Sequence, residues 1–317
     1  MFQINKFIIE LLNINFSKNI TMKKLHLFFF VLSISFVSLY AQNNTAETAI
    51  YYVTLKDKTH YLGKIESEST NYIVLYNAST GTRTEIPINQ IQEKKIIPTK
   101  AIKNNEYWFE NPNATRYLFG PSAFNLKKGE GYYQNTMLLL NSFNVGITDY
   151  FSIGGGIEFL STFITLSEGN FNPIIYFTPK VGFSVADNIH VGGGVLIANI
   201  PQFGETSNTG LGMLYGLGTY GNLDHNVTAT IGWGSVDGNS FNKPLITVSG
   251  MTRVAKKTAL VTENWLIPTD SSYEPIFSYG VRFFGENIAV DLAFINNWDI
   301  AQSLLIGTPY VNFVVKF

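Results

Sequence analysis

The sequence predicts an all-β protein: a transmembrane antiparallel β-barrel of about twelve strands (between about 10 and 14), preceded by a smaller β module. Three observations favour this fold. Charged residues make up only 14% of the 317 residues, whereas soluble domains carry roughly 25%. After residue 41, no run approaches the ~20 consecutive apolar residues that a membrane helix needs. Instead, alternating stretches of about ten residues, the length of a tilted membrane strand, repeat to the C-terminus.

Alternation within these stretches separates an apolar face from a small or polar one. In the stretch after Tyr150, for example, Phe151, Ile153 and Ile157 share one face, and Ser152 and Gly156 share the other. A soluble β-sandwich, the alternative, would carry many Lys and Glu residues on its outer face. A face of Gly, Ser and Thr instead favours a narrow lumen. The twelve strands are expected to begin near Arg116, Tyr132, Tyr150, Pro173, Ile189, Gly210, Val227, Leu245, Thr258, Ile276, Ile288 and Gly307.

The connections between these strands alternate in length. Short turns are expected at 148–149, 186–188, 224–226, 255–257 and 285–287, and longer loops at 125–131, 167–172, 201–209, 237–243, 268–275 and 296–303. This alternation places both ends of the barrel on the short-turn side. In outer-membrane barrels that side faces the periplasm.

Residues 22–41 have the composition of a secretory signal peptide. A positively charged segment with Lys23 and Lys24 precedes a short apolar run. A cleavage site of small residues follows and ends at Ala41. An anchor helix is the alternative, which the short run and its polar far flank disfavour. Residues 1–21 are interpreted as an upstream extension from a misassigned start. The remaining chain is predicted to comprise a β module (42–98), a linker (99–113) and the barrel (114–317).

The module contains about five short strands separated by turn residues, with a single helical turn near residues 86–91. Its motifs Leu62-Gly63-Lys64-Ile65 and Ile86-Pro87-Ile88 resemble those of SH3-like and Sm-like folds. Sm-like domains often bind RNA, but an exported location and the net charge of −1 argue against nucleic acid as a partner. The resemblance implies a small closed barrel, which is expected to act as a periplasmic spacer or docking module.

The last predicted strand carries an apolar face of its own, formed by Val311, Phe313, Val315 and Phe317. This strand resembles the C-terminal assembly signal of Gram-negative outer-membrane β-barrel proteins. The resemblance implies a location in the outer membrane, with the N-terminal module in the periplasm. The implied partners are membrane lipid, the outer-membrane assembly machinery and an envelope component bound by the module.

Six charged residues are expected to point into the lumen: Glu158, Lys180, Arg253, Arg282, Asp291 and Lys316. A hairpin centred on Gly169 would place Glu158 opposite Lys180, and the turn at 285–287 would bring Arg282 near Asp291. These charges would form either a constriction that selects solutes or salt bridges that fill the lumen.

No catalytic, cofactor-binding or metal-ligating residue is expected. Some outer-membrane phospholipases are twelve-stranded barrels with a Ser beside a His; here His190 and His225 flank short turns, and no serine lies two residues from either. Cysteine is absent, and no metal-binding spacing occurs. The expected function is therefore a narrow channel or transporter for small solutes. The alternative is a non-conducting structural or docking protein that acts through its periplasmic module, and an enzyme is least favoured.

Overall fold

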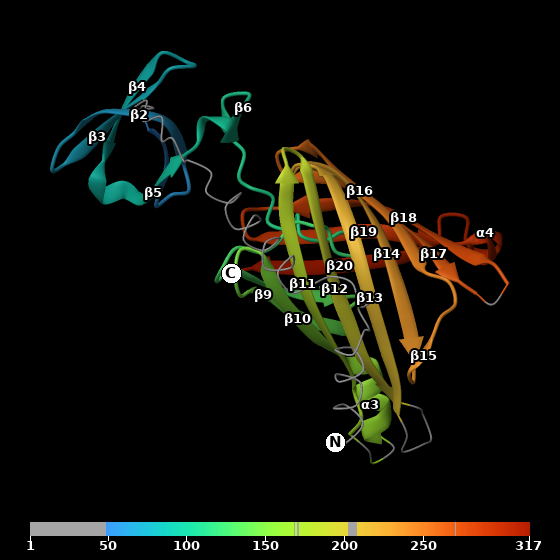
Figure 1. Ribbon diagram of the computed structural model, residues 1–317. Coiled ribbons are helices and arrows are strands. Elements are labelled where there is room, and N and C mark those ends of the chain that lie inside the picture. Colours follow the sequence, from blue (N-terminus) through green and yellow to red (C-terminus); the bar gives the residue numbers. More distant parts are fainter. Residues whose placement is uncertain (1–48, 168, 170, 202–207, 270) are drawn as a thin grey trace, which may run out of the picture. The chain divides into compact units, whose positions relative to one another are not determined.

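The computed structural model describes residues 49–317 apart from 168, 170, 202–207 and 270. Its strands form a five-stranded sheet, a two-stranded ribbon and a closed barrel (Figure 1). The predicted signal peptide and upstream extension lie outside the described residues. No helix among the described residues is long and apolar enough to cross a membrane.

The five-stranded sheet has the antiparallel order β4-β3-β2-β1-β5. Its strands are β1 (Ile50–Leu55), β2 (His60–Glu68), β3 (Tyr72–Asn77), β4 (Thr82–Pro87) and β5 (Ile91–Ile97). Val53, Ile73 and Ile86 form its buried core. The predicted helical turn is confirmed as the 3-10 turn η1 (Ile88–Gln90), whereas the likeness to SH3-like folds stays a prediction. The 3-10 turn η2 (Thr99–Ala101) and the ribbon strands β6 (Ile102–Lys103) and β7 (Glu106–Tyr107) follow.

Twelve strands close the barrel, so the predicted fold class is confirmed. They are β8 (Gly131–Thr136), β9 (Leu140–Gly146), β10 (Phe151–Glu158), β11 (Ile174–Ala186), β12 (Ile189–Pro201), β13 (Asn208–Gly221), β14 (His225–Val236), β16 (Leu245–Ala255), β17 (Thr258–Pro268), β18 (Tyr273–Phe284), β19 (Ile288–Asn296) and β20 (Thr308–Lys316). Each pairs antiparallel with its neighbours, and β20 pairs with β8 to complete the ring. The two-residue strand β15 (Asn239–Ser240) adds to the end of β14.

The first two strands differ from the predicted ones. No strand begins near Arg116, because residues 108–130 are irregular apart from one isolated bridge. The stretch expected to form a single strand from Tyr132 is instead the hairpin of β8 and β9. Its turn contains Met137 and Leu138 at φ 54° and 66°, a left-handed conformation that such residues rarely adopt. The strand predicted near Arg116 is thus absent, and the stretch from Tyr132 forms two strands instead of one. The number of barrel strands therefore stays at twelve.

The connections follow the predicted alternation beyond that point. Turns at 147–150, 187–188, 222–224, 256–257 and 285–287 lie at one end of the barrel, called the turn side below, and the other connections lie at the opposite end, the loop side. Residues 125–130, expected to be a long loop, instead lead into β8 on the turn side. Both ends of the barrel chain meet there, where Gly131 and Phe317 exchange backbone hydrogen bonds of 2.9 and 2.8 Å. Which end faces the periplasm stays a prediction.

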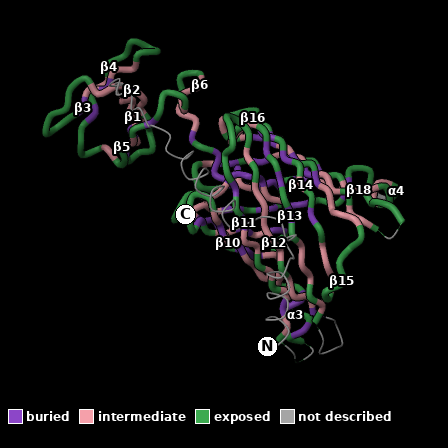
Figure 2. The backbone as a smooth tube through the Cα atoms, in the orientation of Figure 1, coloured by how far each residue is buried: buried purple, intermediate pink, exposed green. Residues whose placement is uncertain are grey.

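The outside of the barrel wall is apolar. In Figure 2, exposed and half-buried residues alternate with buried ones along the strands. The exposed side chains include Phe177, Phe183, Ile197, Leu214, Trp233, Leu260, Phe277, Phe283, Leu292 and Val311. The buried side chains that alternate with them include Gln134, Ser142, Ser152, Thr219, Thr228, Thr247, Ser249, Ser278 and Asn312. Soluble proteins rarely expose an apolar belt of this extent, so the barrel has the inverted polarity of a protein surrounded by lipid.

Two short helices lie on the loop side: α3 (Phe159–Ser167), which continues β10, and α4 (Trp298–Ser303). The polar residues Ser161, Thr162 and Thr165 of α3 are buried, whereas Phe163 and Leu166 are exposed. An apolar helix face turned outward repeats the polarity of the barrel wall. The β-branched and aromatic residues of this segment are typical of strands, and the sequence analysis did not predict a helix here.

Removal of Phe317 is expected to lower the yield of folded barrel severalfold. Its backbone N–H bonds to the carbonyl of Gly131 at the last position of the β8–β20 seam, and its exposed ring belongs to the predicted assembly signal. Phe317→Ala keeps the backbone bonds and removes only the ring. The folded fraction can be measured as the band whose gel mobility changes on boiling. Unchanged assembly of both variants would contradict a role for this residue.

Candidate functional site in the barrel lumen

Residues 109–126, called the inner segment from here on, lie inside the turn-side half of the barrel. Tyr117, Leu118 and Ser122 are almost completely buried. The segment folds on itself between Arg116 and Pro121, which form an isolated β-bridge, and the N–H of Tyr117 bonds to the carbonyl of Gly120 at 2.9 Å. The result is a tight loop of residues 117–120 that is held away from solvent.

Glu263 on β17 anchors this tight loop. Its Oε2 accepts hydrogen bonds from the N–H groups of Leu118 and Phe119 at 2.8 and 3.0 Å, and its Oε1 accepts one from Gly120 at 2.9 Å. The carboxylate is fully buried. Three consecutive backbone donors on one carboxylate satisfy polar groups that no secondary structure would otherwise satisfy. Glu263 therefore fixes the position of the loop within the lumen.

Other strands hold the rest of the inner segment. Lys180 on β11 donates from Nζ to the carbonyls of Ser122 and Phe124 at 2.9 and 2.5 Å. Thr219 on β13 accepts from the N–H of Ala123 at 2.8 Å. On the opposite wall, Tyr310 donates to the carbonyl of Leu118 at 2.7 Å. Side chains of the wall thus bond the backbone of the segment. Its own side chains Tyr117, Leu118 and Leu126 also belong to one buried apolar cluster with residues of the wall.

The hydroxyl of Tyr117 reaches the wall from the inner segment itself. It donates to Asn226 Oδ1 at 2.6 Å and lies 2.7 Å from Thr228 Oγ1. This contact joins the segment to β14.

Arg282 and Asp291 face each other across the turn at 285–287, as expected from the sequence. Arg282 Nε donates to Asp291 Oδ1 at 2.6 Å, and both side chains are completely buried. The same guanidinium donates to the carbonyls of Asn113 and Tyr117 at 2.7 and 2.8 Å. The ion pair is therefore also an attachment point for the inner segment.

The remaining predicted lumen charges are dispersed. Arg253 is buried, stacks over the rings of Trp108, Phe109 and Phe284 and pairs with Asp224 at 2.9 Å. Lys316 pairs with Glu130 at 3.1 Å near the turn side. The six residues do not gather into a single charged ring.

The predicted pairing of Glu158 with Lys180 is wrong. Lys180 lies opposite Ser152 in the β10–β11 register, and Glu158 lies opposite Ile174. The hairpin is centred on Leu166 instead of Gly169, because α3 occupies the connection. Glu158 begins that helix: its two carboxylate oxygens accept hydrogen bonds from the N–H groups of Leu160 and Ser161, both at 2.7 Å.

Glu158→Ala is accordingly expected to destabilise the protein by about 1 kcal/mol, the usual cost of losing a helix cap. Chemical unfolding in lipid vesicles would measure this loss. The ion selectivity of any conductance should stay unchanged, because the carboxylate acts on α3 and not on a constriction. A reversed selectivity would contradict this assignment.

The sequence leaves the facing of Glu263 ambiguous, because its strand alternates poorly, and it does not indicate the inner segment. Glu263 follows the inward residues Ala259 and Val261 at the correct spacing, but the polar Asn264 beside it obscures the pattern. Pro121 was a weak signal for the inner segment, because the strands β11 and β20 also contain prolines, Pro179 and Pro309. A proline inside an expected strand argues against that strand, because it cannot donate to a ladder.

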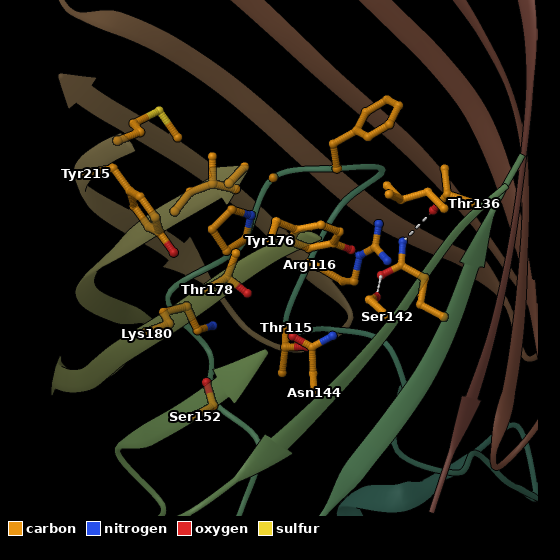
Figure 3. Close-up of a pocket in the computed structure, with 18 of the residues that line it drawn as sticks. Thr115, Arg116, Thr136, Ser142, Asn144, Ser152, Tyr176, Thr178, Lys180 and Tyr215 are labelled. Carbon is orange, nitrogen blue, oxygen red and sulfur yellow. Dashed lines mark hydrogen bonds between the residues drawn. The ribbon is translucent and has the colours of Figure 1, made fainter. Parts of the chain in front are cut away.

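A cavity of about 360 Å³ lies on the loop side of the tight loop (Figure 3). Arg116, Phe119 and Gly120 of the inner segment form part of its surface. The barrel wall supplies polar groups from Thr136, Ser142, Asn144, Ser152, Tyr176 and Thr178 and apolar ones from Leu140, Ile174, Leu196, Ala198, Met213 and Trp265. Its size falls within the range of pockets that enclose small ligands.

The two histidines of the barrel have packing or turn partners. His190 lies half-buried with its ring 4.6 Å from that of Phe124. His225 Nδ1 lies 2.8 Å from Thr252 Oγ1, at the turn side. Neither contact forms the Ser–His pair that a lipid hydrolase requires.

The chain is similar to several solved structures. No protein-family model and no curated protein matches the chain. The KdgM porin in complex with disordered oligogalacturonate is 9% identical at a TM-score of 0.40, covering 59% of this chain and 96% of that one. OmpT of Vibrio cholerae, expressed in the outer membrane, is 13% identical at a TM-score of 0.30, covering 85% of this chain and 94% of that one.

Proposed function

We propose that the protein spans the outer membrane and forms a narrow pathway for small solutes that the inner segment closes. The observation that carries this proposal is the way in which the lumen is filled. The obstruction is a single irregular segment, which is not a strand of the barrel. Hydrogen bonds that can be exchanged for water hold it to the wall, together with a buried apolar cluster that includes Tyr117, Leu118 and Leu126.

The polarity of the wall supports the membrane location. The exposed side chains of the strands and of α3 are apolar, and the buried ones that alternate with them are largely small or polar. A barrel satisfies all its backbone groups within the ring, and therefore can pass through hydrocarbon without exposed edges. In this arrangement the turn side, the module of residues 42–98 and the C-terminal strand are proposed to lie at the periplasmic face. The assembly machinery would read Val311, Phe313, Val315 and Phe317 during insertion.

The lumen supports a pathway rather than a solid core. Beyond the tight loop the interior holds a cavity with hydroxyl and amide groups on its wall, from Thr136, Ser142 and Asn144 among others. Such groups can replace the hydration of a small solute during passage. Movement of the inner segment would connect this cavity with the turn side.

A non-conducting envelope protein is the second candidate. It is favoured by the number of anchors, since Glu263, Lys180, Arg282 and Tyr310 all hold the same segment. In that case the barrel would serve as a membrane anchor, and the N-terminal module, for which the SH3-like resemblance is proposed, would bind a partner.

A reversible cross-link distinguishes the two functions. The N–H of Ala123 lies 2.8 Å from Thr219 Oγ1, and the chain has no cysteine of its own. The double variant Ala123→Cys with Thr219→Cys can therefore tie the inner segment to β13 by one disulfide. Planar-bilayer conductance is measured with the disulfide formed and after its reduction.

The pathway predicts steps in the reduced double variant that disappear on oxidation. Each single-cysteine variant is the control, and its conductance should not respond to the redox state. A folded double variant that is silent in both states would favour the anchoring function. Equal conductance in both states would show that solutes pass without movement of the inner segment.

A further inference from the structure

The buried charges of the lumen do not balance. The fully or almost fully buried ionisable groups of the described barrel are four cations and two carboxylates: Arg116, Lys180, Arg253, Arg282, Glu263 and Asp291. Arg282 pairs with Asp291, and Arg253 pairs with Asp224 at the turn side. Two cations, Arg116 and Lys180, then remain with one carboxylate, Glu263. One basic side chain is left without a buried carboxylate partner.

Both of these cations line the cavity. Arg116 is 4% exposed, and its Nη2 donates to the carbonyl of Leu118, whereas its Nη1 has no hydrogen-bond partner. The ammonium of Lys180 has three donors, of which two are used by the carbonyls of Ser122 and Phe124. Figure 3 shows both side chains among the residues around the cavity.

Glu263 is close enough to Arg116 for their charges to interact, but it forms no hydrogen bond with the guanidinium. Its two oxygens already accept three hydrogen bonds from residues 118–120, and it is not part of the cavity surface. Among the described residues that line the cavity, none is acidic. Arginine keeps its charge when it is buried, and one nitrogen of Arg116 has no hydrogen-bond partner. An anion inside the cavity would therefore be bound favourably at Arg116.

The rest of the cavity surface indicates which kind of ligand body would fit. The rings of Phe119, Tyr176, Tyr215 and Trp265 and the side chains of Leu196 and Met213 lie along the cavity. They suit an apolar or aromatic body better than a strongly hydrated one. The volume of about 360 Å³ limits this body to a small molecule.

We propose that the cavity binds a small organic carboxylate, whose charged group lies at Arg116 and whose apolar body packs against the aromatic wall. The inference depends on the proposed function only for the route by which the ligand arrives. Binding itself requires no conductance.

The test is calorimetric titration of the full-length protein in detergent with 3-phenylpropionate and with its uncharged amide. The acid is expected to bind at least about tenfold more tightly, because a hydrogen bond to a charged carboxylate is stronger than one to a neutral amide. Equal affinity for the acid and the amide would overturn the proposal. This comparison uses the unaltered protein and does not depend on the folding of any variant.

Variants then locate the site. Arg116→Gln should weaken binding of the acid about 10- to 100-fold and leave binding of the amide nearly unchanged. Lys127→Gln removes an exposed cation that lies outside the cavity, and it should change neither affinity. Ala198→Trp fills the cavity from β12 without touching the inner segment and should abolish binding of both compounds. Undiminished binding of the acid by Arg116→Gln or by Ala198→Trp would overturn the assignment.

Failure of this proposal is distinct from failure of the proposed function. Discrimination between acid and amide in a protein that never conducts would refute the pathway and keep the site. Redox-controlled conductance in a protein that binds both compounds equally would refute the carboxylate site and keep the pathway.

Discussion

Arg282→Met is expected to destabilise the folded barrel by about 3–5 kcal/mol, the usual cost of leaving one member of a buried ion pair alone. Asp291 would then be a completely buried carboxylate whose remaining hydrogen-bond partner among the described residues is the side-chain amide of Asn312, at 2.8 Å. The carbonyls of Asn113 and Tyr117 would also lose their donors. Urea unfolding in lipid vesicles, followed by tryptophan fluorescence, measures the change.

A second substitution separates the lost charge from the lost volume. Arg282→Met combined with Asp291→Leu removes both charges, and should recover about 2 kcal/mol or more relative to the single variant. Lys256→Met is the control, because it breaks a solvent-exposed pair with Glu106 and should cost about 1 kcal/mol or less. If the double variant were less stable than Arg282→Met alone, the assignment of the loss to an uncompensated carboxylate would be wrong.

The parts of the fold that the sequence predicted are those with strict periodicity. From β10 onward each strand alternates between lipid-facing and lumen-facing residues, and Asn or Asp and Gly mark many of the turns. The β8–β9 hairpin gave no such signal, since its turn uses Met137 and Leu138 in a conformation that usually requires Gly or Asn. The α3 segment was missed because Phe159, Phe163 and Ile164 are typical strand residues, and because the local cap by Glu158 at its start was not recognised.

In the lumen, too, the residues with a periodic sequence signal were predicted and those without one were not. Alternation identified Lys180, Arg282 and Asp291 as inward-facing, and the short turn at 285–287 was enough to pair the last two. The partners of Lys180 and Arg282 in the inner segment are backbone carbonyls, which carry no sequence signal of their own. An irregular segment that fills a barrel has no periodicity, and only Pro121 contradicted its interpretation as a strand. The register shift caused by α3 then misplaced Glu158.

Glu263→Ala is expected to release the tight loop of residues 117–120. The substitution removes the acceptor of three backbone N–H groups and leaves a space on β17. If the three bonds together contribute about 3 kcal/mol, less than their separate sum, the released population rises about 150-fold. The strand itself should survive, because the β16–β17 pairs on either side of Glu263 use backbone groups only.

Two measurements on Glu263→Ala test the release of the tight loop and the opening of the lumen that should follow from it. Hydrogen exchange of the amides of Leu118, Phe119 and Gly120 should accelerate by about the same factor as the released population. Planar-bilayer conductance should rise in parallel if the inner segment closes a pathway. Asn264→Ala, a substitution at the next residue of β17, is the matched control and should alter neither quantity.

The two measurements together show whether the loop is released and whether its release opens the lumen. Faster exchange without conductance would mean that the loop leaves its anchor while the lumen remains blocked, as expected of a non-conducting barrel. Unchanged exchange would mean that Lys180, Arg282 and Tyr310 hold the segment without Glu263. Conductance in Glu263→Ala that is lost again when Ala123→Cys and Thr219→Cys are added and oxidised would tie the opening to this one segment, because the disulfide acts on the inner segment and on no other connection of the barrel.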